Sequence, residues 1–144
     1  MFDPLMIAPC GLDCTICHRA VDPVKPCEGC RGPDEHKTDF CRYHCTIKKC
    51  DKRSDFAMDF CDECPEYPCG EVMEKETRYT SAYPLVESPL ENLRRIRQNG
   101  MDVFIAQETA QWTCGDCGGV ICVHSGTCAG CGKTYGDQTK NNER

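Results

Sequence analysis

The sequence predicts a small α+β protein that is stabilised by metal and rich in loops. The chain carries 16 cysteines among 144 residues, and its hydrophobic fraction of 40% counts those cysteines. So few other apolar residues can build only small cores. A structural zinc site contributes about 10–16 kcal/mol at neutral pH, which is comparable to the whole stability of a typical domain. We therefore expect much of the N-terminal region to fold around metal.

Cysteine density along the chain predicts the domain organisation. Eleven cysteines lie before residue 70 and five lie between residues 114 and 131, with none between them. We expect a cysteine-rich metal-binding domain over 1–75, a helical linker or packing segment over 76–112 and a zinc ribbon over 113–135. The tail over 136–144 is polar and lacks apolar residues, which predicts disorder.

Three helices are expected in the cysteine-free middle. Ser88-Pro89-Leu90-Glu91 has the pattern of a capping box, with serine at the N-cap and proline at the first helical position. Leucine and isoleucine then recur at helical spacing until Asn99-Gly100 ends the helix. A second helix is predicted over 101–111 and a third over 71–79. These helices carry no catalytic constellation, and we expect them to pack between the two metal-bound ends.

The N-terminal sequence favours a cytoplasmic location. It has no basic segment, and prolines at positions 4 and 9 interrupt its apolar stretch, so it is a poor signal peptide. No run approaches the roughly 18–20 apolar residues that cross a bilayer. Reduced cytosolic thiols favour metal binding, and a disulfide framework is the alternative interpretation.

The C-terminal cysteines give the most specific metal signal. Two C-x-x-C-G knuckles contain the expected ligands Cys114, Cys117, Cys128 and Cys131. Glycine after each second cysteine allows a tight turn that points amide N–H groups at the thiolates. Residues 120–124 are expected to form a strand and 125–126 a turn. Four thiolates suit tetrahedral zinc, although rubredoxin-like iron uses the same geometry.

Two further side chains on that expected strand could replace a ligand. Cys122 and His124 would share one face of the strand, opposite two apolar residues. The simpler interpretation is that Cys122 is a small buried thiol and that His124 is a surface imidazole.

The N-terminal cysteines are harder to pair. One expected four-cysteine site consists of Cys14, Cys17, Cys27 and Cys30. A second consists of Cys45, Cys50, Cys61 and Cys64. Three cysteines are left over, and any of them could replace a member of either site: Cys10, Cys41 and Cys69. Surface roles are expected for three nearby histidines: His18, His36 and His44.

The triplet Cys10, Cys14 and Cys17 suggests an alternative metal. Its spacing is that of the radical-SAM motif, in which three thiolates hold a [4Fe–4S] cluster. Enzymes of that class have a partial (β/α) barrel, and the chain after Cys17 shows no alternating strand–helix pattern. An iron–sulfur redox or sensor protein therefore remains an alternative, without radical chemistry. The C-x-x-C pairs also lack the βαβ context of a thioredoxin-like redox site.

The net charge of the chain indicates which class of macromolecule it binds. The chain has a net charge of −6 and a pI near 5.2, whereas phosphate binding requires clustered cations. Two basic clusters are the exceptions: Arg42, Lys48, Lys49, Lys52 and Arg53, and then Arg94, Arg95 and Arg97. A nucleic-acid-binding zinc ribbon is therefore a second alternative, and a protein partner is preferred.

Several motifs in a fixed order resemble a known family. They are APCGLDC over 8–14, CEGC over 27–30, CTIKKC over 45–50 and CDECPEYPC over 61–69. This pattern is similar to that of a family of small cysteine-rich bacterial and archaeal proteins, which is catalogued as a domain of unknown function and described as zinc-binding. The resemblance covers residues 6–75, and the segment from Trp112 is similar to a ribbon that often follows. Cys41 departs from the family pattern. The resemblance implies metal ligation and provides no activity.

These observations predict a zinc-binding protein with two to three Zn²⁺ per chain, in which structural metal sites support a protein-interaction module. Every ligand is expected to act by thiolate coordination, and no residue is assigned to catalysis. A zinc enzyme is a weaker possibility, because it would need a site with only three protein ligands and a bound water.

Overall fold

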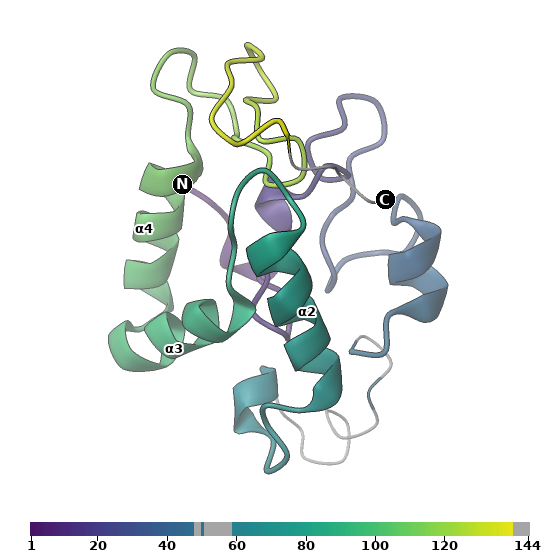
Figure 1. The fold of residues 1–144 in the computed structure, drawn as a ribbon. Helices are drawn as coiled ribbons and strands as arrows, with labels where there is room; N and C mark the ends of the chain where they lie inside the picture. The colour runs from purple at the N-terminus through teal and green to yellow at the C-terminus, as the bar shows by residue number, and fades with distance from the viewer. Residues whose placement is uncertain (48–49, 51–58, 140–144) are drawn as a thin grey trace.

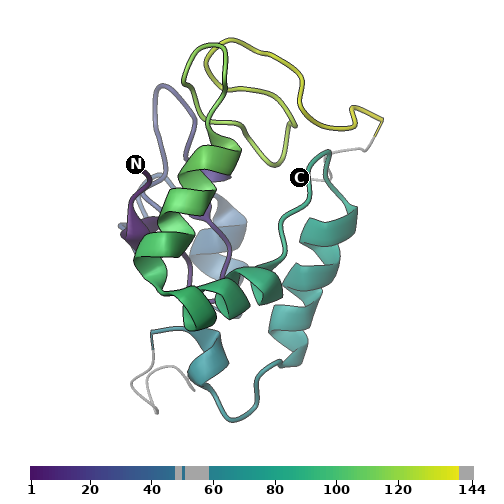
Figure 2. The same ribbon diagram turned by 90° about the vertical axis from the view of Figure 1, so that its left-hand side faces the viewer.

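Three α-helices and several short helical turns make up the regular structure of the residues that the structure describes. The computed structural model describes residues 1–47, 50 and 59–139; most of the basic cluster at 42–53 and the end of the tail lie outside this part of the chain. The α-helices are α2 (Gly70–Ser81), α3 (Pro89–Asn99) and α4 (Met101–Trp112). The short turns are η1 (Pro4–Met6), η2 (Cys14–Ile16), η3 (Phe40–His44) and η4 (Cys61–Glu63). Helix α3 packs against both α2 and α4 at one end of the molecule, and the C-terminal loops lie at the other (Figures 1 and 2).

The three predicted helices are present, and their ends follow the sequence signals. The Ser88 hydroxyl accepts the Glu91 amide at 3.0 Å and so caps α3, with Pro89 at its first position. The same hydroxyl donates to the Glu76 carboxylate on α2 at 2.8 Å, so this cap also joins two helices. Gly100 ends α3 with a φ of +90°, a conformation that favours glycine. No helix within the described ranges has the length and apolar character to cross a membrane.

The expected strand over 120–124 is not formed. Within the described residues, the C-terminal segment makes isolated β-bridges, such as those joining Val120 to Thr113 and Ile121 to Cys128. The chain turns too soon for a ladder to propagate, because the Gly126 amide already returns to the Cys122 carbonyl at 2.9 Å. The predicted turn at 125–126 is therefore present, with Gly126 at a φ of +70°. Among the described residues, the β part of the expected α+β class is reduced to such bridges.

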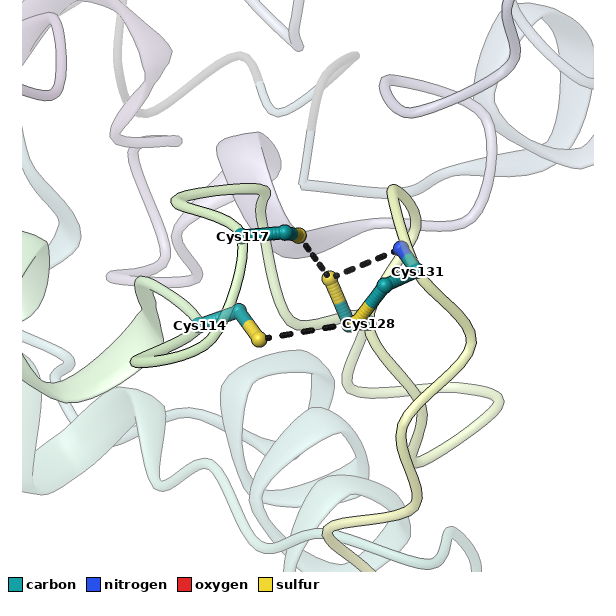
Figure 3. Close-up of side chains that lie close together, drawn as sticks. All are labelled: Cys114, Cys117, Cys128 and Cys131. Atoms are coloured by element: carbon teal, nitrogen blue, oxygen red, sulfur yellow. Dashed lines mark hydrogen bonds between the residues drawn. The ribbon is translucent and has the colours of Figure 1, made fainter.

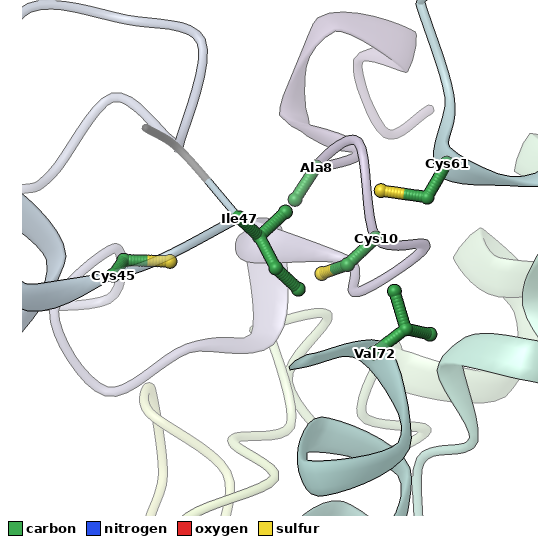
Figure 4. Packing of buried hydrophobic residues seen from close by; sticks show 6 residues of the cluster. All are labelled: Ala8, Cys10, Cys45, Ile47, Cys61 and Val72. Atoms are coloured by element: carbon green, nitrogen blue, oxygen red, sulfur yellow. The ribbon is translucent and has the colours of Figure 1, made fainter. Parts of the chain in front are cut away.

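The apolar cores are small, and cysteine side chains belong to them. Figure 4 shows the first cluster, in which three thiols pack with aliphatic side chains. Its buried members are Ala8, Cys10, Cys45, Ile47, Cys61 and Val72. A second cluster gathers Ile16, Trp112, Cys114, Ile121, Val123 and Cys128, and a third Ile7, Phe104 and Ile105. Packing is therefore continuous across the expected boundaries near residues 75 and 112, and the division into domains stays a prediction.

The predicted tail begins as an anchored segment. The Gly136 amide donates to the Gly126 carbonyl at 3.0 Å, and the Asp137 amide donates to the Pro84 carbonyl at 3.1 Å. The Gln138 side chain donates to the Ser125 carbonyl at 3.0 Å. These bonds hold 136–138 against the rest of the fold, in contrast to the expected disorder from 136.

A buried carboxylate connects the N-terminal loop to the helices. The Glu87 side chain accepts the Asp13 amide at 2.6 Å and the Asn92 amide group at 3.2 Å, and all three residues are buried. Asn92 also donates to the Gly11 carbonyl at 2.8 Å. Burial raises the pKa of Glu87 well above its usual value. These bonds fix the loop over 11–13, directly before Cys14, on the N-terminal turn of α3.

A second buried carboxyl continues this network into α4. Arg95 donates to the Glu108 carboxylate at 2.8 Å and to the Asn92 side-chain oxygen at 3.1 Å. Burial raises the pKa of Glu108 to about 7, and burial also raises the pKa of Asp13. Helices α3 and α4 are therefore joined by an ion pair and by carboxyl groups that hold protons more tightly than exposed ones do.

Replacing Asn92 with alanine should destabilise the fold strongly. The change removes the Asn92 donor to the Gly11 carbonyl and one of the two buried donors to the Glu87 carboxyl group, so the free energy of unfolding should fall by about 2–4 kcal/mol. Urea denaturation in excess zinc measures this free energy of unfolding. The matched control is Gln98→Ala on the exposed face of the same helix. Equal stability of the two variants would contradict the role given to Asn92.

Replacing Glu108 with glutamine should change the pH dependence of stability. The folded carboxyl keeps its proton up to a pKa of about 7, against a usual value of 4.5, so its contribution is complete at low pH and is lost as pH rises through 7. The stability of the wild type relative to Glu108→Gln should therefore fall between about pH 4.5 and pH 7, by at most about 1.4 kcal/mol per pH unit, and should level off above pH 7. If the stabilities of the two proteins changed with pH in parallel, this would contradict the raised pKa assigned to Glu108.

Candidate metal centre

The two C-terminal knuckles have the same backbone structure. In the first, the Gly118 amide donates to the Cys114 carbonyl at 2.9 Å; in the second, the Gly132 amide donates to the Cys128 carbonyl at 3.0 Å. Both glycines have a positive φ, of +78° and +79°. A side chain at these positions would be strained, which explains why each C-x-x-C pair is followed by glycine.

The four thiols of the knuckles converge, as the sequence predicts. The Sγ atoms of Cys114 and Cys131 lie 3.8 Å apart and those of Cys117 and Cys128 lie 3.4 Å apart (Figure 3). All four Sγ atoms lie within 4.8 Å of one another. A tetrahedral zinc ion with Zn–S bonds of about 2.3 Å separates its sulfurs by about 3.8 Å. The four cysteines could therefore hold one metal ion.

Hydrogen bonds to the sulfurs prepare them for coordination. The Gly119 amide donates to Cys117 Sγ and the Gly130 amide donates to Cys128 Sγ, both at 3.3 Å. The Tyr135 hydroxyl donates to Cys114 Sγ at 3.1 Å. Such donors spread the negative charge that thiolates bring to a metal.

The same hydrogen bonds make the thiols unequal. The Tyr135 hydroxyl lowers the pKa of Cys114 to about 6. The Gly119 amide lowers the pKa of Cys117, but the neighbouring thiols of Cys128, Cys131 and Cys114 together with burial outweigh it, and the pKa of Cys117 rises to about 11. One thiol is thus ready to lose its proton at neutral pH, whereas another holds its proton until a cation arrives.

The centre lies at the surface on a buried base. Cys114 and Cys128 are buried, whereas Cys117 and Cys131 are exposed. A Cβ atom on Gly130 would lie 3.0 Å from Cys117 Sγ, so the second knuckle approaches the first closely because it lacks a side chain there. The tip of each knuckle faces outwards, and an ion held here would be shielded from solvent on one side.

Backbone hydrogen bonds attach this centre to the rest of the molecule. The Ile121 amide donates to the Trp112 carbonyl at the end of α4, at 2.8 Å, and the Val123 amide donates to the Ile16 carbonyl of η2, at 2.9 Å. Trp112, Ile121 and Val123 then pack around Ile16 in the second core cluster. The C-terminal segment is therefore docked on η2.

The first expected N-terminal site forms the wall of one cavity. Cys14, Cys17, Cys27 and Cys30 all line it, together with Cys41 and Cys45. Within the described residues, the structure does not bring the Sγ atoms of the expected four within 4.8 Å of one another. It gathers these cysteines around a common space without assigning the ligands, and Cys41, which departs from the family pattern, is among them.

The second expected site is gathered with a different member. Cys50, Cys61 and Cys64 line another cavity, and the fourth cysteine there is Cys69 instead of Cys45. Cys45 lies on the first cavity. The remaining Cys10 is buried in the first core cluster, where burial raises the pKa of its thiol. The pairing of these N-terminal cysteines stays a prediction.

Two histidines differ from their expected surface roles. His124 has an exposed fraction of 0%, and His18 is half-buried against it. The expected alternation of buried and exposed side chains is absent because residues 121–124 are all buried. The segment is covered on both of its faces, so neither face is exposed. The apolar residues directly before His124 were the sequence signal that could have indicated its burial. Cys122 is the buried thiol that the sequence predicts, and His44 is exposed as expected.

Replacing Tyr135 with phenylalanine should weaken metal binding at the knuckles. Loss of the hydroxyl removes the donor to Cys114, so the pKa of that thiol should rise from about 6 towards its usual 9.0 in the metal-free protein. The zinc dissociation constant should increase about 10-fold or more, as for other groups that support metal ligands. Competition with a chromophoric chelator and ultraviolet titration of thiolate measure the two effects. The control Tyr43→Phe, at an exposed tyrosine outside the centre, should change neither.

Comparisons with known proteins add no information about the metal centre. No family model, no curated protein and no solved structure matches this chain. The resemblance of residues 6–75 to a cysteine-rich zinc-binding family therefore stays a prediction. What the geometry establishes is a cluster of four cysteines that could hold a metal ion, in a chain rich in further cysteines.

Proposed function

We propose that the protein binds zinc and that the metal serves a structural purpose in a protein-interaction module. The observation that carries this proposal is the convergence of Cys114, Cys117, Cys128 and Cys131 within 4.8 Å. Four thiolates complete the tetrahedral shell of zinc and leave no position for a substrate or a water. A site of this kind stabilises the loops that provide its ligands.

The spacing of the four sulfurs supports a single ion over an iron–sulfur cluster. In a [4Fe–4S] cluster each cysteine attaches to a different iron, and in a [2Fe–2S] cluster each iron takes two, so the four sulfurs spread farther apart than the 4.8 Å within which these four lie. Separations of 3.4 and 3.8 Å fit the edges of one tetrahedron. A mononuclear iron site with the same ligands is the remaining competitor, and its colour distinguishes it from zinc.

The N-terminal cysteines are proposed to hold the additional zinc, giving two to three ions per chain. Support comes from the two cavities that thiols line, one near Cys27 and Cys30 and one near Cys61, Cys64 and Cys69. The resemblance of this region to a zinc-binding family agrees with the proposal.

A protein partner is favoured over nucleic acid by the charges that the structure pairs. The net charge of the chain is −6. Arg94, Arg95 and Arg97, one of the two basic clusters, form ion pairs with Glu91, Glu108 and Asp62, respectively. Cations that are already paired release fewer counterions from a phosphate backbone, so this cluster is a poor nucleic-acid site.

Metal analysis tests the proposal. Protein purified without air and without added metal should contain two to three zinc per chain and should be colourless. Cys131→Ser should lose one equivalent, because three thiolates hold zinc more weakly than four, whereas Cys122→Ser should retain the wild-type content. Iron with acid-labile sulfide, or equal zinc in wild type and Cys131→Ser, would contradict the proposal.

A further inference from the structure

A second group of metal-binding side chains lies where three distant segments meet. Cys17 and His18 directly follow η2, and His124 belongs to the C-terminal segment that docks on it. One ligand atom from each of the three lies within 4.8 Å of the others. Tyr79 of α2 completes the surroundings through a hydrogen bond to the His124 ring.

The separations of the three ligand atoms match those around one ion. Nδ1 of His18 lies 3.4 Å from Nδ1 of His124 and 3.8 Å from Sγ of Cys17. In a tetrahedral zinc site, two imidazole nitrogens are separated by about 3.3 Å, and a nitrogen and a sulfur by about 3.6 Å. The third separation, between Cys17 Sγ and the His124 ligand atom, is at most 4.8 Å. The backbone therefore already places these atoms at coordination spacing.

The surroundings of His124 select the tautomer that a metal needs. Its Nδ1 accepts the backbone amide of His18 at 3.2 Å, which leaves the ring proton on Nε2. Nε2 then donates to the Tyr79 hydroxyl at 3.0 Å. Histidine ligands characteristically donate the N–H of their second ring nitrogen to a nearby acceptor, which orients the ring. A metal at Nδ1 would replace the hydrogen bond from the neutral His18 amide, which is weak beside a set of coordination bonds.

Packing holds the His124 ring in this orientation. The side chain is completely buried. Its ring centre lies 4.6 Å from that of Tyr83, 4.6 Å from that of His18 and 5.5 Å from that of Tyr79. A ligand confined in this way loses little conformational freedom when a metal binds, because its rotamer is already fixed.

We propose that Cys17, His18 and His124 form a separate zinc site with three protein ligands. Cys17 is thereby taken from the expected four-cysteine set and given to a site that joins residues 17–18 to residue 124. This site is independent of the four-thiol centre, with which it shares no ligand.

The fourth coordination position borders a cavity. Cys17, Tyr79 and His124 all line this cavity, with Cys14 also in its wall. Zinc with three protein ligands keeps a position for water or another small ligand, as exchangeable and catalytic sites do. The site therefore differs in kind from the closed centre at the knuckles: its zinc can accept a small ligand from the cavity.

Zinc content and the chemical nature of the ligands test the site together. The informative variant is His18→Gln, since His18 is half-buried and its backbone amide is retained; His36→Gln, at another half-buried histidine, is the matched control. Wild type and His36→Gln should contain the same amount of zinc, and His18→Gln one equivalent less. X-ray absorption at the zinc edge should show imidazole scattering in wild type and a weaker imidazole signal in His18→Gln.

The outcomes separate this site from the knuckle centre. Cys131→Ser should lose its equivalent of zinc while keeping the imidazole scattering. Equal zinc content in His18→Gln and His36→Gln, or a zinc shell of sulfur alone in wild type, would overturn the proposal and leave an ordinary buried histidine pair. Failure of Cys131→Ser to lose zinc would bear only on the four-thiol centre.

Two measurements on the wild type avoid any folding defect of a variant. Nitrogen-15 spectra of the imidazoles should show zinc-dependent shifts at Nδ1 of both His18 and His124, with the proton on Nε2; spectra that a chelator leaves unchanged would overturn the site. In cobalt-substituted protein, azide should shift the visible bands if the fourth position is open. Unchanged bands would overturn the open position.

Discussion

The buried carboxylate of Glu87 is the contact on which the placement of the metal-binding loops depends. A buried carboxyl group costs free energy unless it is hydrogen-bonded, and here the Asp13 amide and the Asn92 side chain supply donors to Glu87. Because Asp13 is also the N-cap of η2, its position sets the direction in which Cys14 and Cys17 leave the loop. The Ile16 carbonyl of the same turn then receives the C-terminal segment. The hydrogen bonds of Glu87 thus help to position both the turn that carries Cys14 and Cys17 and the C-terminal segment that docks on this turn.

Local signals were sufficient to predict the helices and the knuckles. The serine cap and Gly100 bound α3, and Gly118 and Gly132 mark turns whose φ values require glycine. Each of these features depends on neighbours within a few residues. Convergence of the four knuckle thiols follows in the same way, since each pair is positioned by its own turn and only one loop separates the pairs.

The remaining features depend on contacts between distant residues, and the sequence could not supply them. The replacement of Cys45 by Cys69 beside Cys50, Cys61 and Cys64 depends on how α2 begins next to these loops. His124 is buried because Tyr79 of α2 and Tyr83, which follows the end of α2, cover it. Alternation along a strand is informative only when one face stays in solvent, and the segment before His124 is covered on both faces.

The thiols of the first core cluster have a double character. Cys10 packs as a small apolar side chain beside Ile47 and Val72, and burial favours its protonated form. A metal ligand must instead be a thiolate. The two requirements are compatible only if the metal arrives with the charge that the apolar surroundings lack. Packing and coordination therefore compete for Cys10.

The docking of residue 123 on residue 16 has a consequence for synthesis of the chain. Contacts across such separations, including Asp13 with Glu87 and His18 with His124, join segments that lie 74 and 106 residues apart in the sequence. Folding of such topologies waits for loop closure over most of the chain. On the ribosome, the eleven N-terminal cysteines emerge well before His124 does. The nascent chain must therefore keep its thiols reduced and free of wrongly paired metal until its last core segment has been made.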